Sequence, residues 1–127
     1  MPDALAQFAL AKYISLETFR KTGVGVRTPV WFAADPGAPD VFYVYSAPDA
    51  GKVKRIRNNA HVRVAPSDIR GNLRGAWVDG HAQIVSGAEA DRGQDLLRKK
   101  YGWMKRIGDF FARFRSRPQA VLQIRVG

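Results

Sequence analysis

The stretch VFYVYSAPDAGKVKRIRNN, residues 41–59, contains the clearest local signals in the chain. Its first six residues are rich in β-branched and aromatic side chains, which predicts a strand over residues 41–46. Pro and Gly in segment 47–51 end that strand, and the residues after them predict a short helix over 52–59. A helix N-terminus presents unpaired N–H groups and a partial positive charge, so the start of this helix is a candidate phosphate site.

The predicted helix over residues 52–59 separates its apolar and charged side chains. At about 100° per residue, Val53 and Ile56 fall together and are expected to face the core. Lys52 and Arg55 lie about 60° apart near the helix start, where both can reach one anion. An ammonium group and a planar guanidinium fork together suit a tetrahedral phosphate. Charge runs also commonly face only water, so a basic surface that holds no ligand is the alternative.

Outward from this stretch, short β-rich segments predict a largely antiparallel sheet that can close into a barrel. Further strands are expected over residues 14–19, 24–34, 61–65, 76–85 and 121–126. Pro29 cannot donate a ladder hydrogen bond, so it is expected at an edge, at a bulge or beside something other than a strand. Helices are expected over residues 4–13, 88–101 and 103–114, and a loop over residues 35–40. The sequence thus predicts a mainly β chain with flanking helices, folded as one domain over residues 1–127.

The composition limits the chemistry that the chain can perform. The 127 residues include no cysteine, which excludes disulfides, thiolate metal sites, Fe–S clusters and thiol nucleophiles. The two histidines, His61 and His81, lie on separate predicted strands without metal-ligand spacing or a serine partner. We therefore expect no metal site, and no side chain is identified as catalytic. No segment approaches the roughly 20 apolar residues that span a bilayer, and the start of the chain lacks a basic signal region, so a cytoplasmic protein is expected.

The charge balance is unusual, because 21 Lys and Arg against 11 Asp and Glu give a net charge of +10. Such a surplus attracts polyanions, acidic membrane surfaces or small ligands with phosphates and carboxylates. A nucleic-acid-binding module would use its arginines and aromatic rings on phosphates and bases, but TPVWF, residues 28–32, is not a basic-aromatic platform. The basic segment 99–114 is amphipathic, yet such apolar stripes more often pack against their own domain than on a membrane. A small anionic ligand is therefore the expected partner, rather than nucleic acid or membrane.

Several motifs, taken in order, resemble one family. They are TPVWF (28–32), VFYVYS (41–46), GKVKRIRNN (51–59), HVRVAP (61–66), RGAWVDGHAQIV (74–85) and KKYGW (99–103). Together they are similar to the flavin- and deazaflavin-dependent oxidoreductases of the split β-barrel fold, which are related to pyridoxamine 5′-phosphate oxidase. The branch that the chain resembles most uses coenzyme F420, a 5-deazaflavin. The chain is shorter than pyridoxamine oxidase itself and lacks the extra basic residues that would hold pyridoxal phosphate.

This resemblance implies an FMN-binding type of split barrel and a homodimer with the cofactor at the subunit interface. The cofactor-binding residues that it implies are Thr28, Pro29, Val30, Trp31, Ser46, Lys52, Lys54, Arg55, Arg57 and Trp77. Strand residues 28–31 would lie along the tricyclic ring, and Ser46, Lys52 and Arg55 would hold the phosphate. Lys54 and Arg57 would be auxiliary cations or would contact an acidic tail. Trp77 and segment 101–103 would separate the ring from the partner subunit.

The expected function is that of an oxidoreductase that binds F420 and passes a hydride to an organic acceptor. A deazaflavin transfers the hydride from a ring carbon, so the protein would supply orientation, electrostatics and a dry cavity. F420 carries a phosphodiester and a chain of glutamates, which suits a basic protein better than the single phosphate of FMN. The alternatives are an FMN-dependent oxidoreductase of the same fold, a non-catalytic flavin or tetrapyrrole carrier, and a basic nucleic-acid-binding module.

Overall fold

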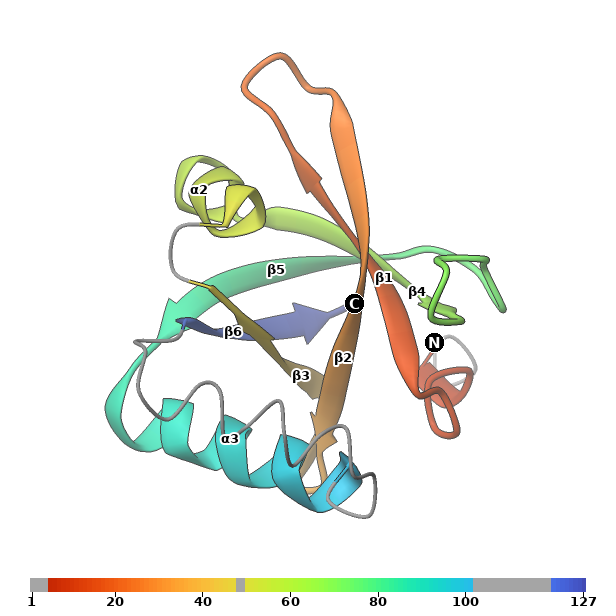
Figure 1. Cartoon of the computed structure of the whole chain (residues 1–127), viewed down its shortest axis with the longest axis vertical. Helices are drawn as coiled ribbons and strands as arrows, with labels where there is room; N and C mark the ends of the chain where they lie inside the picture. Colours follow the sequence, from red (N-terminus) through yellow and green to blue (C-terminus); the bar gives the residue numbers. More distant parts are fainter. Residues whose placement is uncertain (1–4, 48–49, 102–119) are drawn as a thin grey trace.

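Six antiparallel strands form a closed barrel in the computed structural model, which describes residues 5–47, 50–101 and 120–127. The strand order around the barrel is β1-β2-β3-β6-β5-β4, and pairing of β4 with β1 closes it. The elements are β1 Tyr13–Phe19, β2 Gly25–Asp35, β3 Ala38–Ser46, α2 Gly51–Asn58, β4 His61–Ser67, β5 Val78–Val85, α3 Gly87–Tyr101 and β6 Ala120–Val126. Figure 1 shows α2 beside the projecting β1–β2 hairpin and α3 at the other end of the barrel. The mainly β fold with flanking helices is thus confirmed.

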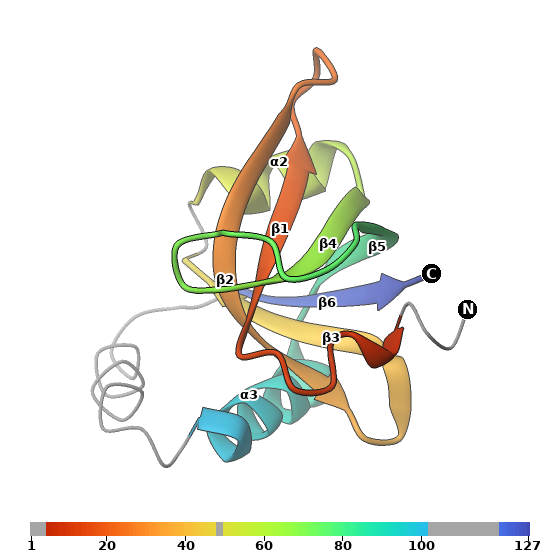
Figure 2. The same ribbon diagram turned by 90° about the vertical axis from the view of Figure 1, so that its right-hand side faces the viewer.

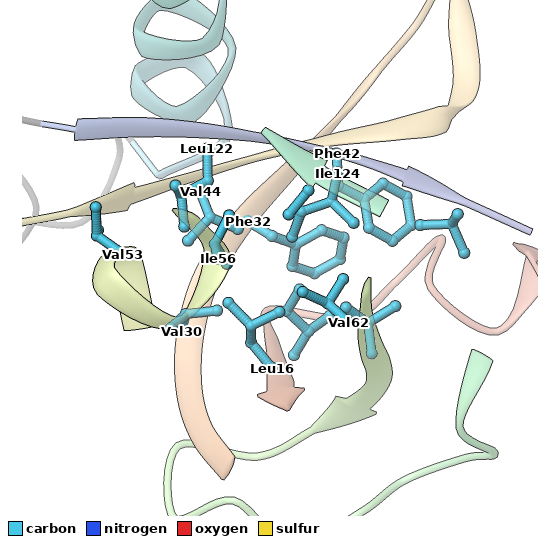
Figure 3. Close-up of a cluster of buried hydrophobic side chains, with 14 of the residues drawn as sticks. Leu16, Val30, Phe32, Phe42, Val44, Val53, Ile56, Val62, Leu122 and Ile124 are labelled. Atoms are coloured by element: carbon cyan, nitrogen blue, oxygen red, sulfur yellow. The ribbon is translucent and has the colours of Figure 1, made fainter. Parts of the chain in front are cut away.

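Apolar side chains that alternate along the strands fill the barrel (Figure 3). Leu16, Phe32 and Leu122 are among the largest fully buried side chains of this core. Val53 and Ile56 of α2 are buried against the same cluster, as their spacing predicts. The helix therefore covers one end of the barrel, and its position fixes where its cations lie.

Strand β2 changes its pairing partner midway along its length. Residues 25–31 pair with β1, whereas residues 32–35 pair with β3. In the described part of the chain, each half of β2 therefore has a strand on only one side. Pro29 lies in the first half, opposite Ser15 of β1, with no strand on the side toward β3. Within the described residues Pro29 therefore lies at an edge, which is one of the positions expected for it.

The hydroxyl of Tyr101, the last residue of α3, lies where β2 changes partner. It accepts a hydrogen bond from the backbone N–H of Phe32 at 3.2 Å. It also lies 2.9 Å from the carbonyl of Phe32 and 2.5 Å from the carbonyl of Lys12, of which its single proton can serve one at a time. Burial raises the pKa of this phenol, so it stays protonated. Tyr101 thus satisfies backbone groups that have no strand partner there.

The predicted N-terminal helix over residues 4–13 is wrong. Of the described residues in this range, 5 and 6 alone are helical, residues 7–10 form turns, and Tyr13 already begins β1. The cause is tertiary docking, which overrides helix propensity. Phe8 is 3% exposed and inserts into the barrel core, while Gln7 exchanges two hydrogen bonds with the backbone of Ala76.

The predicted loop over residues 35–40 is also shorter than expected. Pro36 and Gly37 alone separate β2 from β3, because Asp35 organises the turn. The Asp35 carboxylate accepts the backbone N–H of Gly37 at 2.9 Å and binds Arg92 of α3 at 2.5 and 2.8 Å. The helix expected over residues 103–114 and the extent of the single domain both involve residues 102–119, which lie outside the described part of the chain. Among the helices that are described, none has the length and apolar character needed to cross a membrane.

Candidate cofactor site

A cavity of about 310 Å³ lies beside residues 25–31 of β2, the half of the strand that does not pair with β3. It is lined by Tyr13, Pro29, Val30, Trp31, Tyr45, Lys52 and Ile69. Three of the four residues expected along the ring, 29–31, therefore meet one of the expected phosphate-binding cations in a single cavity. The wall is apolar and aromatic except for that ammonium group and two phenols, a composition common in small-molecule sites.

The alternation of β2 explains how its residues face the cavity. Val30 is buried and belongs to the barrel core, so Pro29 and Trp31 lie on the opposite, outer face of the strand. The Trp31 ring packs against the ring of Tyr101 at a centroid distance of 5.8 Å, which holds it in place. The outer face of β2 thus offers an apolar surface, and in the described part of the chain its residues 25–31 have a strand partner on one side only.

Thr28, the fourth residue expected along the ring, carries a buried polar atom. Within the described part of the chain, its Oγ1 is buried and has no hydrogen-bond partner. Buried hydroxyls are nearly always hydrogen-bonded to protein or water. Thr28 is not among the residues that line the cavity, and the alternation of β2 places it on the face of Val30, opposite Pro29 and Trp31. The fit of the cavity to a ring with an anionic group therefore rests on the apolar wall and on Lys52.

Lys52 and Arg55 converge at the start of α2, and Lys52 lines the cavity. Burial, and then the charge of Arg55, lower the pKa of the half-buried Lys52 ammonium from its usual value. The Arg55 guanidinium folds back over the helix start, since a Cβ at Gly51 would lie 2.7 Å from its Nη1. Its Nε donates to Oγ1 of Thr18 at 2.6 Å, and this partner is neutral. Among residues 5–47, 50–101 and 120–127, no carboxylate pairs with Arg55. An anion between the two cations would relieve their mutual repulsion.

The other expected phosphate and tail contacts do not line the cavity. Ser46 is buried at the end of β3, and its hydroxyl donates to the carbonyl of Ala47 at 3.2 Å. Lys54 and Arg57 are exposed on α2. Because Arg57 follows Lys52 by five residues, it lies on the other flank of the buried Val53 and Ile56 stripe. The structure therefore brings together two of the four helix cations and not the rest.

Trp77 also lies away from the cavity, in a cluster that sequence reasoning missed. The guanidinium groups of Arg27 and Arg63 both lie over its ring, with their Cζ atoms 4.8 and 4.9 Å from the ring centroid. Both arginines bind the carboxylate of Glu17, at 2.9 and 2.6 Å. Strand register places Glu17 directly opposite each arginine, so this signal becomes visible only once the pairing is known.

Glu17 gives the fold a sensitivity to acid. Burial opposes ionisation of this carboxyl, but the hydrogen bonds from Arg63 and Arg27 outweigh it and hold its pKa below the usual value. A carboxyl with a lowered pKa stabilises the fold above its unfolded pKa, near 4.5, and this contribution is lost as the pH falls through the folded value. We expect the free energy of unfolding to fall below about pH 5 less steeply in Glu17→Gln than in the wild type. Urea titrations at several pH values measure this, and parallel curves would contradict it.

Three residues of the cavity wall, Tyr13, Tyr45 and Ile69, were not expected. Tyr13 lies opposite Trp31 in the register of β1 and β2, so correct pairing would have indicated it. Tyr45 follows from the alternation of β3, in which neighbouring Val44 faces the core. Ile69 lies in the loop after β4, and nothing in the sequence singles it out.

Comparison with known proteins finds similarity in solved structures only. No protein-family model and no curated protein matches the sequence. A Bacteroides thetaiotaomicron protein assigned to 5-nitroimidazole antibiotic resistance matches with a TM-score of 0.72 and 15% identity, over 98% of this chain and 78% of that one. A Listeria innocua protein assigned as a pyridoxamine 5′-phosphate oxidase matches with a TM-score of 0.67 and 16% identity, over 98% and 91%. An F420 reductase matches with a TM-score of 0.63 and 18% identity, over 96% and 91%.

These matches cover nearly the whole chain at low identity, so they bear on the fold. They agree with the closed six-stranded antiparallel barrel that the strand pairing shows. The chain therefore has the split β-barrel fold of the pyridoxamine 5′-phosphate oxidase-like proteins.

Proposed function

We propose that the protein is an oxidoreductase that binds coenzyme F420 beside β2 and passes a hydride to an organic acceptor. The observation that supports this most is that Lys52 lines the cavity beside the apolar face of β2 and has Arg55 next to it, while no carboxylate among the described residues pairs with either cation. An anionic group on a flat ring is the ligand chemistry that this combination suits. The resemblance of the sequence motifs to the F420-using branch supports the choice of coenzyme.

Each part of the cavity has a task in this proposal. Pro29 and Trp31 support one face of the ring, and the backbone of β2 meets its polar edge. Lys52 and Arg55 hold the phosphodiester, with charge-assisted hydrogen bonds that are stronger than neutral ones. A bound deazaflavin would supply the hydride, while the protein orients it and excludes water. Apolar acceptors such as quinones or unsaturated ketones suit the remaining apolar wall.

Charge favours F420 over FMN. The chain has a net charge of +10, and Lys54 and Arg57 place two exposed cations on the helix that carries the phosphate contacts. An acidic tail that leaves the cavity along α2 can interact with them, whereas FMN has no such tail. We also propose that the protein acts in the cytoplasm, on the sequence grounds given above.

The coenzyme assignment is tested by titrating the protein with F420 and with FMN side by side, following coenzyme fluorescence. We expect F420 to bind at least about tenfold more tightly at low salt, since it offers more negative charge to the basic surface. Raising the ionic strength should reduce the difference in affinity between F420 and FMN, because exposed charges are screened. Equal or tighter binding of FMN would overturn the coenzyme assignment. Binding of F420 without oxidation of its reduced form by quinones or unsaturated ketones would favour a carrier.

A second subunit is proposed to cover the open side of the cavity, as the family resemblance implies. Ile69 on its rim is 56% exposed, and Pro29 is also exposed, so the ring would otherwise face water on one side. Light scattering is expected to give about twice the chain mass of 14.1 kDa. A monomer at micromolar concentration would contradict the shared site.

A further inference from the structure

A second and larger cavity, of about 840 Å³, lies at the end of the barrel formed by the β2–β3 hairpin. It adjoins residues 32–35, the half of β2 that does not pair with β1. Figure 2 shows the N-terminal turns above α3 at this end of the barrel. No lining residue is shared with the cavity that holds Lys52, so the two are separate sites.

The wall of the larger cavity is mostly hydrocarbon. Phe8, Phe32 and Phe42 contribute aromatic surface, and Leu5 and Leu96 contribute aliphatic surface. The volume lies within the range of about 300–1,000 Å³ that is typical of small-molecule sites. An apolar molecule of moderate size therefore fits the space.

The charged groups of this wall are of two kinds. Asp35 is held by Arg92 through contacts of 2.5 and 2.8 Å, which compensates its charge. Lys99 and Lys100, in the last turn of α3, place two positive charges at the cavity. The two lysine charges together outweigh the roughly half unit of negative charge that the helix dipole places at the C-terminus of α3.

Lys100 is bound to the apolar wall in a way that favours an anion nearby. Its Nζ lies 3.5 Å from the centroid of the Phe32 ring, and burial lowers the pKa of the ammonium to about 8. A negative group in the cavity would stabilise the charged form of this half-buried side chain. The surroundings thus combine a hydrocarbon space with two ammonium groups.

We propose that this cavity binds a small apolar carboxylate, with the carboxylate at Lys99 and Lys100 and the hydrocarbon part against Phe8 and Phe42. The site does not depend on the coenzyme proposed for the other cavity. Each can be tested while the other is left intact.

The test uses 1-anilinonaphthalene-8-sulfonate as a fluorescent apolar anion and dodecanoate as its competitor. We expect dodecanoate to displace the dye, and dodecanol, which has the same chain without the charge, to be at least about tenfold weaker. Lys99→Ala/Lys100→Ala should weaken dodecanoate binding by about tenfold or more. Lys54→Ala, which removes an exposed lysine from α2, should leave it unchanged.

A second variant keeps the test independent of the lysines. Ala9 is exposed and lines the cavity, so Ala9→Trp is expected to fill space there without disturbing the core. It should abolish displacement by dodecanoate while the melting temperature and F420 binding remain those of the wild type. Unchanged dodecanoate binding in Ala9→Trp, or equal competition by dodecanol, would overturn the proposal.

Discussion

The Lys52→Ala/Arg55→Ala variant is expected to bind F420 at least about 30-fold more weakly than the wild type, a loss of about 2 kcal/mol. The two side chains converge at the start of α2, where the charge of Arg55 already lowers the pKa of Lys52. A phosphodiester between them would accept charge-assisted hydrogen bonds from both. Fluorescence titration at one fixed ionic strength measures the loss.

The matched control is Lys54→Ala/Arg57→Ala. Both double variants remove two positive charges from the same helix and from the same net charge of +10, so long-range attraction falls equally. The control changes exposed positions that do not line the cavity. We expect its effect to be smaller and to vanish at high salt, since exposed charges are screened. Equal losses in the two variants would show that the helix attracts the coenzyme without holding its phosphate.

Arg55 also has a structural partner, so a weaker affinity has to be separated from a changed fold. Its Nε donates to Oγ1 of Thr18 at 2.6 Å, and this bond is lost in the double variant. Lys52→Ala alone keeps that bond and is expected to retain the melting temperature of the wild type. It should still lose about tenfold in affinity, because one of the two charged contacts is removed.

The barrel was predictable because its signals are local. Alternation and β-branched or aromatic residues identify strands such as β3, and the spacing of Val53 and Ile56 identifies the buried face of α2. The pairing register is not local, since it depends on which strands meet across the barrel. The change of partner in β2 and the opposition of Glu17 to two arginines therefore emerge only from the structure.

The candidate site was predictable where short local segments supply its residues. Residues 29–31 and Lys52 lie in stretches with distinct local patterns, and they do line one cavity. The position of Trp77 was not predictable in this way, because its ring contacts Arg27 and Arg63, which are distant in the sequence. The prediction for the N-terminal segment was wrong for a related reason. Docking of Phe8 into the barrel core decides the conformation of this segment, whereas helix propensity does not.

Replacement of that anchor, in Phe8→Ala, is expected to lower the free energy of unfolding by about 3–5 kcal/mol, as for other buried Phe truncations. Phe8 is 3% exposed, and its ring meets the rings of Phe42 and Phe32 edge-on at 5.0 and 6.2 Å. Urea denaturation measures the change. Leu10→Ala is the control, because Leu10 lies two residues away and is 96% exposed. It should change stability by less than about 0.5 kcal/mol. Similar small effects in both variants would contradict this prediction. Phe8 would then contribute no more to stability than an exposed side chain, and the N-terminal turns would not close the barrel.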